Sequence, residues 1–196
     1  GEFQAELVAR EKKLAILRVG AYLDRDCASP LRIHLVQGLS RGERMDYVVQ
    51  KAVELGVHSI TPMITERCNV KLAADRVSNR LQHWKKVMVS ACEQSGRCQL
   101  ATIHPPCNLS DWLQHHTMSG FIAQPGCERT MAHYINQPLD EVAMLIGPEG
   151  GFTQNECEFA TENGIQPLGL GQRILRTETA TVTALTLLQA QWGDLK

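Results

Sequence analysis

The sequence lacks long apolar runs and paired cysteines. No apolar run among the 196 residues reaches the ~18 needed to cross a bilayer, and the longest, such as 142–146, has the length of a strand. We therefore predict no membrane span. The seven cysteines are odd in number, scattered and never spaced as C-x-x-C, so neither a disulfide framework nor a zinc site is indicated. This cysteine usage favours a cytoplasmic protein.

An excess of charge of either sign is also missing. Twenty Lys and Arg against 21 Asp and Glu give a formal charge of -1, so any nucleic-acid partner must be held by a local patch. The seven histidines are dispersed, and we expect no metal. A hydrophobic content of 43% supports a sizeable core and excludes a disordered chain. The length predicts one main domain plus an appendage.

The appendage is predicted at the N-terminus. Apolar and polar residues alternate over 3–9 and again after a charged turn at 10–13, which indicates a β-hairpin ending near residue 23. The polar, Pro-ended stretch 24–30 is typical of a linker. A lone hairpin is marginal in water, so we expect it to pack on the main domain or to be part of a larger β domain. The chain starts at Gly1 without a signal-peptide pattern, so we expect a trimmed form of a longer chain.

The rest of the chain alternates strand-like and helix-like segments, which predicts an α/β domain with a largely parallel sheet. Capping boxes at Ser40-x-x-Glu43 and Thr153-x-x-Glu156 predict the starts of two helices, and Ser110 the start of a third. Another helix is predicted from about Arg76, with Trp84 in the core. The remaining segments are strands over 33–39, 57–64, 99–104, 121–124, 142–146 and 165–170, and a last helix that ends near Trp192.

A glycine-rich loop, Gly147-Pro148-Glu149-Gly150-Gly151, follows the strand predicted at 142–146. Its three glycines permit positive φ and the close approach of a ligand to the main chain, as in a cofactor cradle, although a simple tight turn has the same composition. The loop is neither a P-loop nor G-x-G-x-x-G. Because Glu149 would repel a phosphate, a neutral or cationic nucleoside is the favoured ligand.

A second loop, residues 171–179, leads into the last helix and carries Arg176 and Glu178. A carboxylate at a helix start is favoured by the helix dipole, and an arginine there can form a surface ion pair. These structural roles need no ligand. The loop nevertheless has more polar groups than a connector requires, which favours a functional site.

The two loops together resemble a known pair of motifs. Leu145–Gly151 followed by Leu170–Ala180 is similar to the C-terminal signature of the RsmE family, SPOUT-class enzymes that methylate N3 of a uridine in 16S ribosomal RNA of the small subunit. The resemblance covers about Leu31 to Lys196. It continues upstream, in the family's order, through Ser40–Met45, Gln50–Lys51, Glu54–Val57, Ile60–Pro62, Glu66–Cys68 and Glu93–Arg97.

This resemblance implies a fold, a cofactor and partners. Residues 28–196 would form a SPOUT methyltransferase domain, an α/β knotted parallel sheet with a C-terminal trefoil knot, which is rare among proteins. Residues 1–27 would be a linker and the remnant of a PUA-like β-barrel. A homodimer would bind small-subunit ribosomal RNA, with S-adenosylmethionine in the knot. The implied cofactor-binding residues are Gln124, Pro125, Ile146, Gly147, Gly150, Gly151, Leu170, Gly171, Ile174, Leu175 and Thr179.

The same resemblance suggests roles for charged residues. Methylation at N3 requires that the imide proton leaves and that charge on the neighbouring carbonyl oxygens is stabilised. Arg176 can donate hydrogen bonds to that charge, and Glu178 or Glu149 can accept the proton. The uridine must be unpaired or flipped out. Four further arginines could contact RNA or be ordinary surface charges: Arg41, Arg44, Arg67 and Arg97.

Three other functions are considered. The first is a non-catalytic RNA-binding or ribosome-assembly factor with the same fold, which intact Arg176 and Glu178 disfavour. The second is a SPOUT methyltransferase that acts on another RNA nucleotide. The third, a dinucleotide-dependent dehydrogenase, suits the α/β pattern but lacks the glycine fingerprint.

Overall fold

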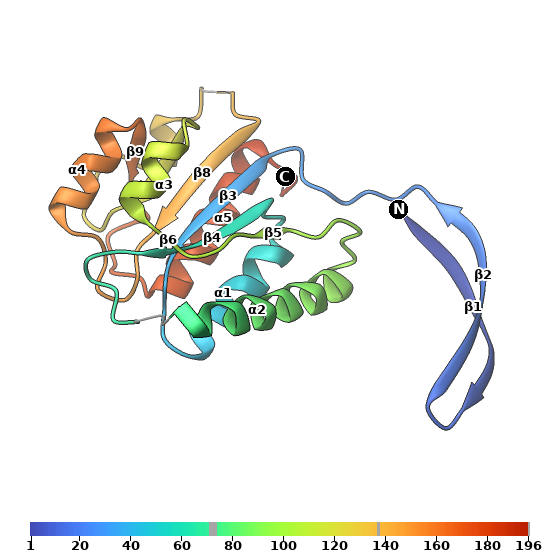
Figure 1. The fold of residues 1–196 in the computed structure, drawn as a ribbon. Helices are drawn as coiled ribbons and strands as arrows, with labels where there is room; N and C mark the ends of the chain where they lie inside the picture. The colour runs from blue at the N-terminus through green and yellow to red at the C-terminus, as the bar shows by residue number, and fades with distance from the viewer. Residues whose placement is uncertain (71–73, 137, 196) are drawn as a thin grey trace.

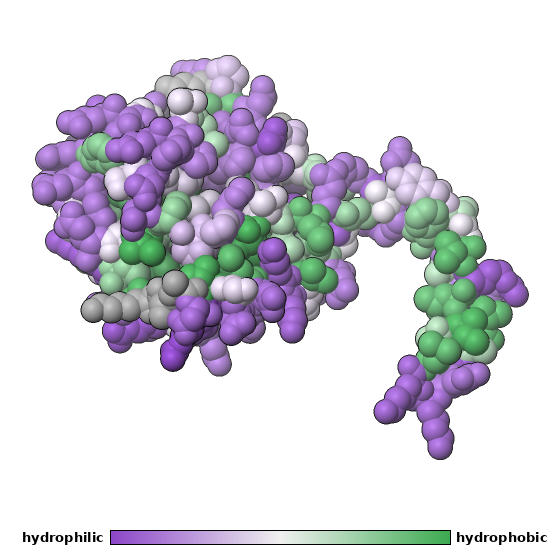
Figure 2. All heavy atoms as spheres, in the orientation of Figure 1, coloured by the Kyte–Doolittle hydropathy of each residue, from purple (hydrophilic) through white to green (hydrophobic). Residues whose placement is uncertain are grey.

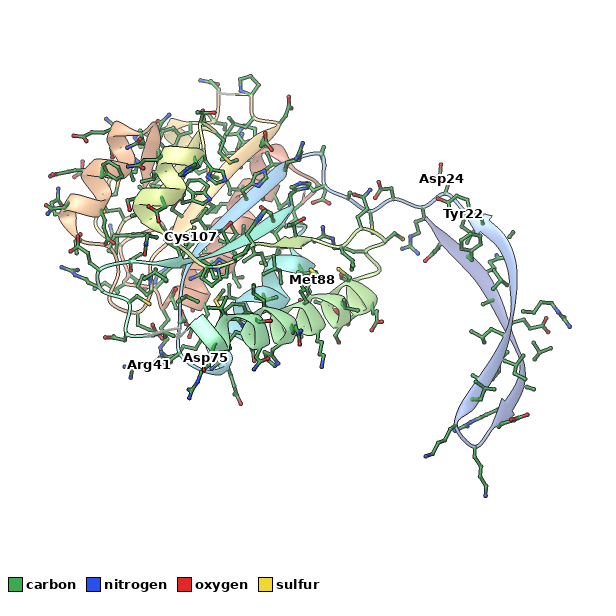
Figure 3. The ribbon with its side chains drawn as sticks, in the orientation of Figure 1. Tyr22, Asp24, Arg41, Asp75, Met88 and Cys107 are labelled. Atoms are coloured by element: carbon green, nitrogen blue, oxygen red, sulfur yellow. The ribbon has the colours of Figure 1, made fainter. Side chains whose placement is uncertain are left out.

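A long antiparallel hairpin begins the chain, as predicted. The computed structural model describes residues 1–70, 74–136 and 138–195. Strand β1 (Glu2–Glu11) pairs with β2 (Leu14–Leu23), and the hairpin reaches away from the rest of the protein (Figure 1). Tyr22 and Asp24 mark its base (Figure 3). Its apolar side chains are exposed, as the green surface in Figure 2 shows. The hairpin therefore adds nothing to the main core, and its assignment to a β-barrel stays a prediction.

The remainder is an α/β domain built on a parallel sheet, which confirms the predicted fold class at that level. The strand order is β5-β4-β3-β8-β7-β9, with β6 beside β4, and every pairing within this sheet is parallel. The strands are β3 (Arg32–Gly38), β4 (Ser59–Ile64), β5 (Thr102–Ile103), β6 (Cys107–Asn108), β7 (Gly120–Ala123), β8 (Glu141–Ile146) and β9 (Ile165–Leu168).

Helices cover both faces of this sheet because successive strand residues point to opposite sides. Leu35 and Met144 pack with the buried residues of α1, α2 and α5, whereas Val36 and Leu145 pack with those of α3 and α4. Trp84 lies in the first of these clusters, as predicted. No helix in the described part of the chain is long and apolar enough to cross a membrane. The helices are α1 (Glu43–Glu54), α2 (Ala74–Ser95), α3 (Leu109–His115), α4 (Gln154–Glu162), α5 (Thr177–Trp192) and the short 3-10 helix η1 (Met131–His133).

One predicted capping box is confirmed and another is wrong. At α4, the Thr153 hydroxyl accepts from the Glu156 N–H at 3.2 Å, and the Glu156 carboxylate accepts from the Thr153 N–H at 2.8 Å. At α1, the N-cap is Gly42 with a φ of 60°, and Ser40 Oγ donates instead to the Gly38 carbonyl. The turn from β3 into α1 needs a left-handed residue, which glycine adopts most easily. Helix α3 likewise begins after Asn108, so Ser110 lies inside it.

The carboxyl ends of β3 and β8 touch main chain to main chain. A Cβ built on Gly38 would overlap the backbone nitrogen of Pro148 and lie 2.7 Å from the Gly147 carbonyl carbon. Both partners are backbone atoms, so neither can rotate away. Glycine at position 38 therefore lets the loop after β8 lie directly against the end of β3.

We predict that Gly38→Ala lowers the free energy of unfolding by about 1–3 kcal/mol, the usual effect of overpacking a close contact. Gly20→Ala is the matched control, because a Cβ there meets only an ordinary contact at 3.4 Å. Urea unfolding followed by circular dichroism measures both variants. Equal stability of the Gly38→Ala variant and the unaltered protein would contradict the close contact.

Candidate functional site

The two glycine loops meet at one pocket. The pocket has a volume of about 680 Å³ and lies at the carboxyl ends of β7, β8 and β9, the edge where ligands bind in parallel α/β sheets. The first loop follows β8 and the second follows β9, and Gln124 and Pro125 follow β7. A pocket of this size suits a small-molecule ligand.

All but one of the predicted catalytic and cofactor-binding residues line this pocket. Thr179 does not: it is exposed in the first turn of α5, where Glu178 and Ala180 face the pocket. Successive helix residues point about 100° apart, which carries Thr179 out to solvent. The lining residues from the predicted set are Gln124, Pro125, Ile146, Gly147, Glu149, Gly150, Gly151, Leu170, Gly171, Ile174, Leu175, Arg176 and Glu178.

A buried hydrogen-bond network, which sequence reasoning missed, joins the two loops. Gln37 on β3 has no exposed surface, and its Nε2 donates to Thr177 Oγ1 at 3.0 Å. Thr177 Oγ1 in turn donates to the Gly147 carbonyl at 2.6 Å. Thr181 Oγ1 donates to Gln37 Oε1 at 2.6 Å. We call these four residues the Gln37 clasp. It fixes the start of α5 against the first loop, and its only trace in the sequence is a glutamine inside a buried strand.

Arg67, from the segment after β4, braces the outer part of the first loop. Its Nη1 donates to the carbonyls of Gly150 and Phe152 at 3.3 and 3.1 Å. A Cβ on Gly150 would come within 2.8 Å of the Arg67 Cβ. Glycine at position 150 therefore lets the loop pack against Arg67. The Gln37 clasp holds the loop at Gly147, and Arg67 holds it at Gly150 and Phe152.

Glu149 is engaged within the protein. Its Oε1 accepts from Arg44 Nη1 at 2.7 Å and from the Arg41 backbone N–H at 3.2 Å. Burial raises the pKa of this carboxyl, but hydrogen bonds from its own backbone N–H, Arg44 and Arg41 outweigh it, so the pKa lies below its usual value. A carboxylate with a lowered pKa is a weak proton acceptor, which makes Glu149 better suited to holding Arg44 in place.

Glu178, unlike Glu149, has a carboxylate oxygen that is not engaged within the described part of the protein. Arg176 is the N-cap residue of α5, and Glu178 lies in the first turn beside it. Within the described residues, the buried Oε2 of Glu178 has no hydrogen-bond partner. A buried acceptor without a partner is unfavourable, although the helix dipole offsets part of the cost. Glu178 is therefore available to a donor brought by a ligand.

The four arginines considered as RNA contacts separate into two groups. Arg41, Arg44 and Arg67 all contact the first loop or the segments beside it. Arg97 is elsewhere: its guanidinium donates to the Val53 and Val57 carbonyls at 2.8 and 3.0 Å, where it satisfies the end of α1. Arg97 thus has a structural role that is evident from its partners.

Comparison with known proteins identifies the family. Residues 27–189 match the family model described as RNA methyltransferase domain. A ribosomal RNA small subunit methyltransferase E from Buchnera aphidicola is 35% identical over 99% of this chain and 77% of its own length. The chain belongs to the ribosomal RNA small subunit methyltransferase E family. The resemblance seen in the motifs is confirmed.

Solved structures agree with this assignment to the methyltransferase E family. A methyltransferase from Legionella pneumophila, solved with bound cofactor SAM, has a TM-score of 0.91 and 42% identity over 98% of this chain and 80% of its own. A ribosomal RNA small subunit methyltransferase E from Neisseria gonorrhoeae, bound to S-adenosyl methionine, has a TM-score of 0.89 and 38% identity over 98% and 79% of the two chains.

The ion pair of Glu149 predicts a pH dependence in this methyltransferase. A carboxyl whose folded pKa is lowered stabilises the protein above its unfolded pKa, near 4.5, and loses that contribution as the pH falls through the folded pKa. The free energy of unfolding of the unaltered protein should therefore exceed that of Glu149→Gln by a constant amount above about pH 5, and the difference should shrink at lower pH. Urea unfolding at several pH values measures it.

Arg44→Ala is the partner control for this pH series. In the Arg44→Ala background, Glu149→Gln should have a smaller effect above pH 5, because the shared ion pair is already gone. A difference between Glu149→Gln and the unaltered protein that grows as the pH falls would contradict the assignment.

Proposed function

We propose that this chain methylates N3 of a uridine in small-subunit ribosomal RNA, with S-adenosylmethionine as methyl donor. The observation that carries the proposal is the pocket formed by the two glycine loops, in a chain of the ribosomal RNA small subunit methyltransferase E family. The methyltransferases from Legionella pneumophila and Neisseria gonorrhoeae, both with high TM-scores, were solved with this cofactor.

The residues of the pocket fit S-adenosylmethionine. The lining draws on three segments, 124–125, 146–151 and the loop residues 170–171 and 173–175, whose backbones can offer N–H and carbonyl groups to an adenosine. Glu178, whose buried Oε2 has no partner among the described residues, suits a cationic ligand, and neither a phosphate loop nor a dinucleotide fingerprint is present. A Cβ on Gly147 would lie 3.1 Å from Gly151 backbone atoms, so glycine keeps the loop in this tight form. When bound, the cofactor supplies an electrophilic methyl group.

Arg176 and Glu178 are the proposed catalytic residues. Glu178 accepts the N3 proton, because one of its carboxylate oxygens is buried without a partner among the described residues. Arg176, two positions earlier at the pocket, donates charge-assisted hydrogen bonds to the carbonyl oxygens as negative charge develops on the ring. Glu149 instead positions Arg44. The uridine has to be unpaired or flipped out, because N3 lies on its pairing edge.

The finer features of the family resemblance belong to the same proposal. A C-terminal trefoil knot is supported by the contact between the start of α5 and the first loop, where Thr177 Oγ1 donates to the Gly147 carbonyl, and by the packing of α5 against α1 and β8. A homodimer would cover Ile174, whose side chain is 86% exposed at the pocket. The exposed apolar hairpin of β1 and β2 supports a PUA-like barrel. The place of action is the cytoplasm, where small subunits are assembled.

Transfer of labelled methyl groups tests the function. The chain is incubated with labelled S-adenosylmethionine and small subunits from a methylation-deficient strain, and the RNA is digested to nucleosides. The proposal predicts that the label appears in 3-methyluridine. Label in another nucleoside would indicate a different RNA target, and binding of RNA without any transfer would favour a non-catalytic factor.

We predict that Arg176→Ala lowers the rate of transfer by about 100- to 1,000-fold, which corresponds to the loss of one donor to a developing anion. The affinity for S-adenosylmethionine, measured by calorimetry, should change little. Arg32→Ala is the control of equal charge, because Arg32 pairs with Glu141 at the opposite edge of the sheet. Turnover near that of the unaltered protein, with cofactor binding intact, would remove Arg176 from the mechanism.

A further inference from the structure

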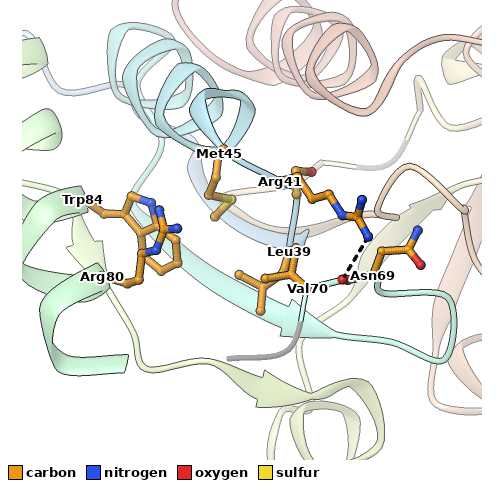
Figure 4. A pocket seen from close by; sticks show the side chains of 9 residues that line it. Leu39, Arg41, Met45, Asn69, Val70, Arg80 and Trp84 are labelled. Atoms are coloured by element: carbon orange, nitrogen blue, oxygen red, sulfur yellow. Dashed lines mark hydrogen bonds between the residues drawn. The ribbon is translucent and has the colours of Figure 1, made fainter. Parts of the chain in front are cut away.

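A second, smaller pocket lies beside the pocket formed by the two glycine loops, which we call the methyl-transfer pocket. It has a volume of about 210 Å³ and is bounded by the turn after β3, the start of α1, the segment after β4, and α2 (Figure 4). Its walls are apolar: Leu39, Met45 and Trp84 line it, and each of these side chains is at most 2% exposed. We call this space the Trp84 pocket.

The mouth of the Trp84 pocket is cationic. Arg80 projects from α2 one turn before Trp84, and Arg41 comes from the turn before α1 (Figure 4). Arg41 Nη2 donates to the Asn69 carbonyl at 3.5 Å. In the described part of the chain, no carboxylate forms an ion pair with either guanidinium. Figure 3 shows Arg41 on the outer edge of the domain. Two unpaired cations thus flank an apolar opening.

The size and chemistry of the Trp84 pocket select its ligand class. A volume of about 210 Å³ is below the ~300–1,000 Å³ of pockets that enclose a whole drug-sized molecule, so the space accepts one flat ring system. The apolar side chains close the bottom of the pocket and expose too little surface for stacking, so they suit the edge of a nucleobase, and arginines at the rim suit the phosphate attached to it. An apolar ligand without charge would make no use of Arg41 and Arg80.

The two pockets have no lining residue in common, but Glu149 connects them, which brings both within reach of one strand of RNA. Glu149 Oε1 accepts from the Arg41 N–H and from Arg44 Nη1. Arg41 lines the Trp84 pocket, and Arg44 lines the methyl-transfer pocket. The Cα atoms of these two residues are at most ~11 Å apart along the chain, at ~3.6 Å per residue. A strand whose target uridine enters one pocket can therefore present a nearby base to the other.

We propose that the Trp84 pocket binds the base of a nucleotide that flanks the target uridine, with the phosphate held by Arg41 and Arg80. This inference rests on the proposed function, because it assumes a single-stranded RNA substrate. It gives the enzyme a second point of contact with its RNA. That contact sets the register of the strand and provides sequence preference outside the target uridine.

Binding of short RNAs tests the proposal. The probes are a labelled single-stranded RNA with one central uridine and a series in which one flanking nucleotide at a time is abasic, and fluorescence anisotropy measures each affinity. The proposal predicts that one flanking abasic site weakens binding by about 10-fold, whereas the others change it little. In Val70→Phe, which places a ring into the Trp84 pocket from its wall, that penalty should disappear.

Arg80→Ala tests the phosphate contact with a matched control. Loss of one phosphate contact to single-stranded RNA should reduce the slope of log K against log salt by about 0.7. Lys86→Ala removes the same charge from the exposed side of α2 outside the pocket, and it should leave the slope unchanged. Calorimetry with S-adenosylmethionine shows in parallel that each variant keeps its cofactor site.

Failure of this inference differs from failure of the proposed function. If the unaltered chain methylates small subunits and binds the probes, but abasic sites and Arg80→Ala have no more effect than the Lys86→Ala control, the Trp84 pocket is not a base site. If the unaltered chain neither transfers methyl groups nor binds the probes, the proposed function fails and the inference fails with it.

Discussion

The whole site depends on one buried hydrogen-bond network, the Gln37 clasp. A glutamine at the centre of a parallel sheet must satisfy both ends of its amide, because an unpaired buried polar group costs about 1–3 kcal/mol. Here both ends are satisfied by threonines of α5, and one of these threonines also donates to the loop after β8. Segments that are 140 residues apart are thereby fixed in one geometry. The pocket exists because these segments cannot separate without leaving buried groups unpaired.

Close contacts between backbones complete that arrangement. Gly38 lets the loop after β8 lie against β3, and Gly150 lets it pack against Arg67. A loop held so closely has little freedom left to lose when a ligand binds, which reduces the entropic cost of binding. The two glutamates differ in their partners. Glu149 forms an ion pair with Arg44, whereas Glu178 has a buried oxygen without a hydrogen-bond partner in the described structure. This difference is why we propose that Glu149 positions Arg44 and that Glu178 accepts the proton.

Local signals in the sequence predicted much of this structure, and contacts between distant residues explain the remainder. The Thr153 capping box is encoded within four residues and was confirmed. The start of α1 was predicted wrongly, since the direction of the chain after β3 requires a left-handed glycine at position 42. The sequence left Arg97 open as an RNA contact or a surface charge, because its carbonyl partners lie 40 or more residues away. The two loops were found through their motifs, but the position of Thr179 depends on the phase of α5, which the motif does not contain.

Calorimetric titration of S-adenosylmethionine into Gln37→Met and Gln189→Met is the most direct test. Gln189 is the matched control: it is equally buried, bonds Ser29 Oγ and the Leu55 carbonyl, and lies at the far end of α5. Both variants should lose similar stability, about 1–3 kcal/mol. We predict that Gln37→Met weakens cofactor binding by about 5-fold, the equivalent of one net hydrogen bond of about 1 kcal/mol, while Gln189→Met changes it less than ~2-fold. Equal affinity in the two variants would contradict the role of the Gln37 clasp.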